Sequence, residues 1–188
     1  WVLTALLQSP HFLYRAELGE HVGEGVYELT AFEIATQLSY LVWGTLPDAE
    51  LFAVASSGEL LDPDVREEQV QRLLADPKAR GQLAHFSNQW LEVNQLATVP
   101  KDAEMYPAFT PAIRADMAEE LTRWVNHVVW EGGGSLSDLF LEPSTMVTAE
   151  LAAYYGLEAM GEPDSSGFDL TSTEGSPYGG VLTQGEPS

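Results

Sequence analysis

Apolar residues recur every three or four positions over most of the chain, a spacing that predicts amphipathic α-helices. The clearest example is residues 29–61, where Thr30 followed three positions later by Glu33 forms a capping-box signal for a helix start. The apolar side chains expected to face the core from this helix are Phe32, Ala35, Leu38, Leu41 and Val42. Gly44 suits the left-handed residue that ends a helix, and a second helix is expected after Pro47. We therefore predict a helical hairpin around which the chain is organised.

A second signal, a capping residue followed by proline at the first helical position, occurs repeatedly. It is found at Asp62-Pro63, Asp76-Pro77 and Thr110-Pro111. The last of these opens the longest predicted helix, whose apolar face is Ile113, Met117, Leu121, Trp124, Val125 and Val128. Glycines 132–134 are expected to stop it. Ser9-Pro10 predicts a break in the helical pattern of residues 1–18, because proline lacks the N–H that a continuing helix needs. Residues 148–155 predict a short helix that Gly156 ends.

Two glycine-rich stretches interrupt this helical pattern. Residues 19–27 contain three glycines and are expected to form a loop. Residues 156–188 are rich in glycine, serine, proline and threonine, which predicts an irregular arm or a linker leading into a following domain. Within it, Gly180 to Gln184 is the stretch with packing potential. The predicted fold is therefore all-α: a single domain of seven or eight helices over residues 1–155, followed by the irregular arm.

Composition supports a folded domain and narrows its partners. Of the 188 residues, 45% are hydrophobic and five are tryptophan, which is enough to build a buried core. The 29 acidic and 8 basic residues give a net charge of −21, so nucleic acid and anionic membrane surfaces are unsuitable partners. No run approaches the roughly 20 apolar residues of a transmembrane helix. The absence of cysteine excludes disulfides, thiolate catalysis, iron–sulfur ligation and covalent haem attachment within this sequence.

Candidate catalytic residues are few. His11 and Arg15 lie one helical turn apart near Tyr14, and together with Trp43 they are the residues that we single out for a polar site. In that reading His11 serves as an acid–base group or an axial ligand. The alternative is that His11 is a hydrogen-bonded core histidine and that Trp43, like the other aromatic residues at helical spacing, fills the core.

The acidic C-terminal part offers a candidate metal site. Beyond Arg123 there are ten acidic residues and no lysine or arginine. Glu162, Asp164 and Asp169 fall in one short run, although their spacing departs from the helix–loop–helix calcium pattern. The run either binds Ca²⁺, faces a basic partner, or is a solvated surface whose charges repel one another.

Several short stretches together carry a family resemblance. They are Ser9–Arg15, Tyr27–Leu29, Leu38–Trp43, Leu46–Asp48 and Phe86–Leu91. Over residues 3–155 the chain resembles domain-of-unknown-function family 1592, found in large exported proteins of Planctomycetes and myxobacteria. Residues 179–184 resemble the opening of the neighbouring family 1588. The resemblance implies a periplasmic or extracellular location and a setting beside c-type-cytochrome-like domains, with any haem on a partner or on a domain outside this sequence. It supplies no catalytic residues.

These observations favour one function over two alternatives. We expect a non-catalytic helical module, a fragment of a larger exported and redox-associated protein, that holds other domains of the same polypeptide or a protein partner. Abundant helix caps and apolar stripes without a recognisable site support this reading. The first alternative is part of an oxidoreductase or hydrolase whose site is completed by missing domains. The second is a calcium-dependent binding domain. No cofactor other than Ca²⁺ is expected within the chain.

Overall fold

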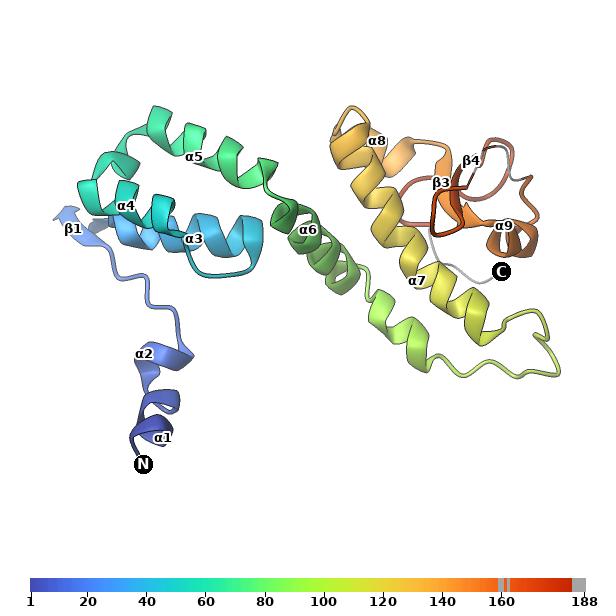
Figure 1. The fold of residues 1–188 in the computed structure, drawn as a ribbon, viewed down its shortest axis with the longest axis horizontal. Helices are drawn as coiled ribbons and strands as arrows, with labels where there is room; N and C mark the ends of the chain where they lie inside the picture. Colours follow the sequence, from blue (N-terminus) through green and yellow to red (C-terminus); the bar gives the residue numbers. More distant parts are fainter. Residues whose placement is uncertain (159–160, 162, 184–188) are drawn as a thin grey trace. The chain divides into compact units, whose positions relative to one another are not determined.

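A computed structural model describes residues 1–158, 161 and 163–183, and gives only the backbone for His11 and Ala97. The chain divides into two compact units, Trp1–Gln82 and Leu83–Ser188, which we call unit 1 and unit 2. The division falls inside helix α6. Figure 1 shows the elements of each unit along the chain. In the described residues, no helix is long and apolar enough to cross a membrane.

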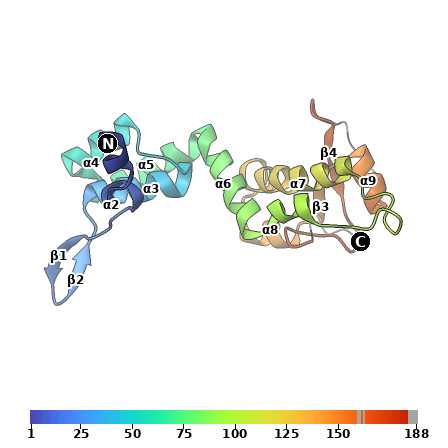
Figure 2. The ribbon, with the colours of Figure 1, turned by 90° about the horizontal axis from the view of Figure 1, so that it is seen from below.

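Unit 1 is built from short helices and one hairpin. Its elements are α1 (Val2–Leu7), α2 (Pro10–Leu13), β1 (Glu20–Gly23), β2 (Val26–Glu28), α3 (Ala31–Trp43), α4 (Ala49–Ser57), the 3₁₀ turn η1 (Glu59–Leu61), α5 (Pro63–Ala75) and the start of α6 (Pro77–Trp90). The helices α3, α4 and α5 pack together, and the β1–β2 hairpin projects from them (Figure 2).

The helix boundaries predicted for α3, α4 and α5 are confirmed, whereas residues 14–18 of the helical pattern predicted over residues 1–18 are not helical. Thr30 and Glu33 form both halves of the capping box at the start of α3, and Gly44 ends the helix with a φ of 68°. Asp48 caps α4, and Asp62 caps α5 with Pro63 at its first position. The chain also breaks between α1 and α2 at the predicted Ser9-Pro10.

The packing face of α3 differs from the prediction. The residues buried from this helix are Ala31, Ala35, Ser39 and Trp43. Of the large apolar side chains expected in the core, Phe32 is 46% exposed, Leu41 is 73% exposed and Leu38 is half-buried. The buried face of α3 therefore consists of three small residues and Trp43, and larger apolar side chains such as Leu41 lie near the surface.

Unit 2 is organised around one long helix. Its elements are the second half of α6, the 3₁₀ segment η2 (Val93–Thr98), α7 (Pro111–Asn126), the π-helical segment η3 (His127–Glu131), α8 (Leu136–Leu141), β3 (Ser144–Thr148), α9 (Ala149–Tyr155) and β4 (Phe168–Ser172). The predicted apolar face of α7 is confirmed, because all six of its residues are buried. They divide between two core clusters. Val147 and Leu151 join the first cluster, and Val181, from the predicted packing stretch, joins the second.

The expectation of an all-α chain is confirmed only in part, because two small antiparallel sheets accompany the helices. β1 pairs with β2 over residues 20–28, a stretch where the three glycines of residues 19–27 had indicated a loop. β3 pairs with β4, which lies inside the predicted irregular arm. On β3 the side chains of Ser144, Thr145 and Val147 are buried, so β-branched and small residues carry this strand into the core.

Candidate functional site

Residues Arg15–Gly19, which we call the strap, have no regular secondary structure and lie along α3. The backbone amides of Leu18 and Gly19 donate to Glu33 Oε1 at 2.7 and 3.1 Å. Farther along α3, the Gln37 side-chain amide donates to Glu17 at 2.8 Å, and the Arg15 guanidinium lies 5.0 Å from the centre of the Tyr40 ring. Contacts follow the helix from Glu33 to Tyr40, about 11 Å, while the strap spans about 13 Å if fully extended. The strap therefore runs antiparallel to α3.

Glu33 serves two structures at once. Its carboxylate accepts from the amide and hydroxyl of Thr30, both at 2.8 Å, in addition to the two strap amides. The Thr30 backbone hydrogen bond contributes most to lowering the pKa of Glu33 from its usual 4.5 to about 2, followed by that of Gly19. One carboxylate thus links the N-terminus of α3 to the strap, and both links depend on its charge.

We expect the strap to loosen in acid. A carboxyl group whose pKa is lowered by folding stabilises the folded state fully above its unfolded pKa, near 4.5, and that contribution is lost as the pH falls through about 2. The amide proton shifts of Leu18 and Gly19, followed by NMR, should therefore titrate with a midpoint near 2. In Glu33→Gln they should no longer titrate with this carboxyl group, whereas the exposed Glu67→Gln should retain the transition. A midpoint near 4.5 would contradict the linkage.

The predicted residue Arg15 lies at a shallow, open cavity of about 370 Å³ in unit 1. The cavity is lined by Arg15, Glu17, Gln37, Tyr40, Leu41 and Gln82. Arg15 forms an ion pair with Glu17 at 3.3 Å, so its charge is already matched within the strap. This lining presents a guanidinium, a phenol and amides, which suits hydrogen bonding to a polar group. Tyr14 is 73% exposed and does not line this cavity, and the His11 side chain lies outside the described part of the chain.

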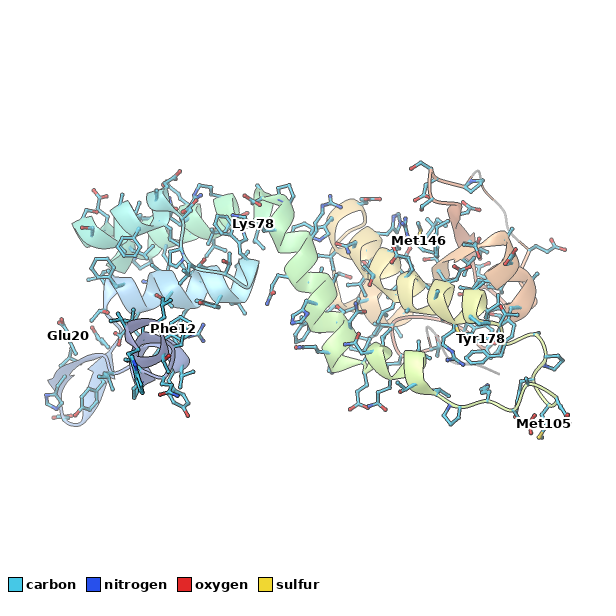
Figure 3. The ribbon with its side chains drawn as sticks, turned by 60° about the horizontal axis from the view of Figure 1, so that its bottom comes forward. Phe12, Glu20, Lys78, Met105, Met146 and Tyr178 are labelled. Carbon is cyan, nitrogen blue, oxygen red and sulfur yellow. The ribbon has the colours of Figure 1, made fainter. Side chains whose placement is uncertain are left out.

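Trp43 belongs to a different part of unit 1. Its indole N–H donates to the Leu73 carbonyl oxygen at 2.8 Å, which joins α3 to α5. The Lys78 ammonium lies 4.2 Å from the ring centre and the Arg72 guanidinium 5.8 Å from it (Figure 3 labels Lys78). Arg72 also binds Asp48, the cap of α4, at 2.7 and 3.0 Å, and this hydrogen-bonded pairing lowers the pKa of Asp48. The structure therefore places Trp43 in a helix junction and does not bring it beside Arg15.

The proposed calcium ligands are partly described. Glu162 lies outside the described residues, and the other two carboxylates accept hydrogen bonds from the chain itself. Asp164 forms an ion pair with Arg123 at 2.7 Å and accepts from the Ser166 hydroxyl, the main cause that lowers its pKa to about 2. Asp169 accepts from the Gly161 amide at 2.6 Å. Calcium binding here would have to displace these donors, and the calcium site stays a prediction.

A buried carboxyl group on α7 was not singled out in the sequence. Glu120 is 1% exposed and accepts hydrogen bonds from the hydroxyls of Thr145 at 2.5 Å and Tyr155 at 2.8 Å. The centre of the Tyr155 ring in turn lies 4.8 Å from the centre of the ring of Tyr178, which is labelled in Figure 3. Glu120 thereby connects α7 to β3 and α9. Its position within the apolar stripe of α7, between Met117 and Leu121, is the only signal that could have identified it among 29 acidic residues.

Comparison with known proteins gives one match. The family described as PSD4, a protein of unknown function (DUF1592), matches residues 29–157 through its family model. No curated protein and no solved structure matches the chain. Among the described residues, no three or more histidine, aspartate and glutamate side chains gather in an arrangement that could hold a metal ion.

Proposed function

We propose that this chain, which belongs to the family described as PSD4, a protein of unknown function (DUF1592), is a non-catalytic helical module that binds neighbouring domains. The observation that carries the proposal is the exposure of the N-terminal segment, residues 1–14. Its exposed large apolar side chains are Trp1, Val2, Leu3, Leu6, Leu7, Phe12, Leu13 and Tyr14. Figure 3 shows Phe12 within this segment. An apolar surface of this kind typically marks a contact with another protein surface.

The strap gives this segment a defined attachment point. Because Arg15, Glu17 and Gly19 bind successive turns of α3, the two short helices that precede them are connected to the body of unit 1 through a fixed segment. An attached apolar segment of this kind can pack against a partner without unfolding α3. Helix α1 has six residues and buries none of them, so its stability depends on what it packs against.

Two further contacts support a structural role over chemistry at the candidate residues. Trp43 donates its N–H within a helix junction, and Arg15 pairs with Glu17 of the same strap. Trp43 thus joins α3 to α5, and Arg15 joins the strap to α3 through its contact with the Tyr40 ring. We place the module in a larger exported, periplasmic or extracellular protein that also carries c-type-cytochrome-like domains. Support for that setting comes from the sequence resemblance alone.

The proposal predicts that residues 1–14 become covered in the intact polypeptide. Amide hydrogen exchange of α1, measured by mass spectrometry, should be at least about tenfold slower in the parent polypeptide than in the isolated chain, because packing suppresses local opening. Leu7→Ser in the parent polypeptide should restore fast exchange. Leu141→Ser, which changes a 74% exposed leucine on α8, should not. Equal exchange in both forms, or stoichiometric metal, haem or turnover in the isolated chain, would overturn the proposal.

A further inference from the structure

Unit 1 contains a second, more apolar cavity along α3, which shares Gln37 with the first. It measures about 500 Å³, within the roughly 300–1,000 Å³ typical of ligand pockets. Its aliphatic lining consists of Leu29, Ile34, Leu38 and Leu61, contributed by the residues before α3, by α3 itself and by η1. Arg66 of α5, Glu28 and Gln37 provide its polar groups. The arrangement is an aliphatic recess with a cationic side chain at its wall.

Arg66 lines this cavity and differs in its contacts from Arg72 and Arg123. Its Nη2 donates to the Leu61 carbonyl oxygen at 3.1 Å, which holds the guanidinium beside the recess. Its Nε is covered by protein atoms and has no hydrogen-bond partner among the described residues. In contrast with Arg72 and Arg123, it forms no ion pair with a described carboxylate, although the chain contains 29 acidic residues. A guanidinium at a cavity wall that is not paired with a carboxylate can take its anion from a ligand.

We infer that this cavity binds a monocarboxylate with an aliphatic chain, its head group on Arg66 and its chain against the four aliphatic side chains. Guanidinium binds carboxylate through paired, charge-assisted hydrogen bonds, and Arg66 is the cationic side chain that lines this cavity. The aliphatic lining removes the chain of the ligand from water. Glu28 lines the same cavity, so each carboxylate of a ligand meets a like charge there, and a ligand with one anionic end is favoured over one with two. This ligand site goes beyond the proposed role in domain contacts.

The isoleucines provide a direct test. The chain contains two, Ile34 in the cavity and Ile113 in the core of unit 2. In protein labelled with ¹³C only at the isoleucine δ-methyl group, sodium decanoate should shift the Ile34 signal in a saturable manner and leave Ile113 unchanged. Decanol and decanedioate should each bind at least about tenfold more weakly than decanoate, because one lacks the charge and the other adds a repelled charge.

Matched variants separate the cation from general charge effects. Arg66→Gln should weaken decanoate binding at least about tenfold and leave decanol binding unchanged. Arg80→Gln, an exposed arginine of unit 1 outside the cavity lining, should change neither. The Trp43 indole N–H signal reports whether unit 1 stays folded in each variant. The inference is overturned by any of four results: no shift of Ile34, equal shifts of Ile34 and Ile113, equal binding of decanol, or tighter binding of N-acetyl-Leu-Glu, which would assign the cavity to a peptide.

Discussion

Replacing Trp43 by alanine should lower the free energy of unfolding of unit 1 by about 3–5 kcal/mol, the usual range for removing a large buried aromatic side chain. The indole is 7% exposed, so the substitution leaves a cavity in the α3–α5 junction. It also removes the indole donor of the Leu73 carbonyl oxygen, which then keeps the Asp76 amide at 3.2 Å, and it removes the ring that Lys78 and Arg72 cover. Each loss acts between helices, and none is restored by local rearrangement of α3.

Urea unfolding followed through the Ile34 methyl signal measures this loss in unit 1 alone. Trp43→Phe keeps most of the ring but lacks the N–H, and should lose only about 1–2 kcal/mol. Trp90→Ala removes a tryptophan of unit 2 that is 46% exposed, and should leave the Ile34 transition in place. If Trp43→Ala costs less than about 1 kcal/mol, the residue does not hold the junction together and its role as a candidate site residue regains support.

Glu120→Ala should lower the stability of unit 2 by about 3 kcal/mol, because it removes a side chain that is 1% exposed together with the hydrogen bonds that its carboxyl group accepts from two hydroxyls. Those donors, on Thr145 and Tyr155, come from β3 and α9, so the loss affects how both elements pack on α7. Glu120→Gln keeps one acceptor oxygen and should cost less, about 1 kcal/mol.

The Ile113 methyl signal in urea reports this transition, since Ile113 lies in the core cluster of α7, β3 and α9. The matched control is Glu119→Ala. Glu119 is the neighbouring residue on α7, and its more exposed carboxylate pairs with Arg123 at 3.0 Å. Because exposed ion pairs contribute little, this change should stay within about 1 kcal/mol. Equal effects at the two positions would show that Glu120 does not act through its buried hydrogen bonds.

Helix starts were predictable because they depend on a few adjacent residues. The capping box at Thr30 and the aspartate–proline and threonine–proline pairs specify their own backbone geometry, whatever packs against them. The face of α3 was not predictable in the same way. Which face of α3 is buried depends on the elements that contact it, α4, α5 and η1. The periodicity of apolar residues does not show where those elements lie. The strands were missed because each has only three to five residues and pairs with a distant or glycine-rich partner.

The candidate site shows the same limit. Sequence reasoning selected Arg15, which does line a cavity, but it also grouped Trp43 with it, and that residue lies in a separate junction. Sequence reasoning did not select Arg66, because an arginine on an acidic helix looks like one more surface charge. Its missing partner becomes visible only when the positions of the surrounding carboxylates are known. Glu120 was missed for the related reason that burial of one acid among many depends on the strand that covers it.

The pairing of β3 with β4 has a consequence for synthesis of the chain. Residues 144–148 leave the ribosome well before residues 168–172, with helix α9 between them. Strand β3 therefore cannot form its hydrogen bonds until β4 has been synthesised. The second core cluster is completed later still, because its residue Val181 is synthesised after β4. Unit 1, by contrast, closes mainly through neighbouring segments, which favours rapid folding. A nascent chain would therefore carry a finished N-terminal unit while the C-terminal one remains open to chaperones or export factors.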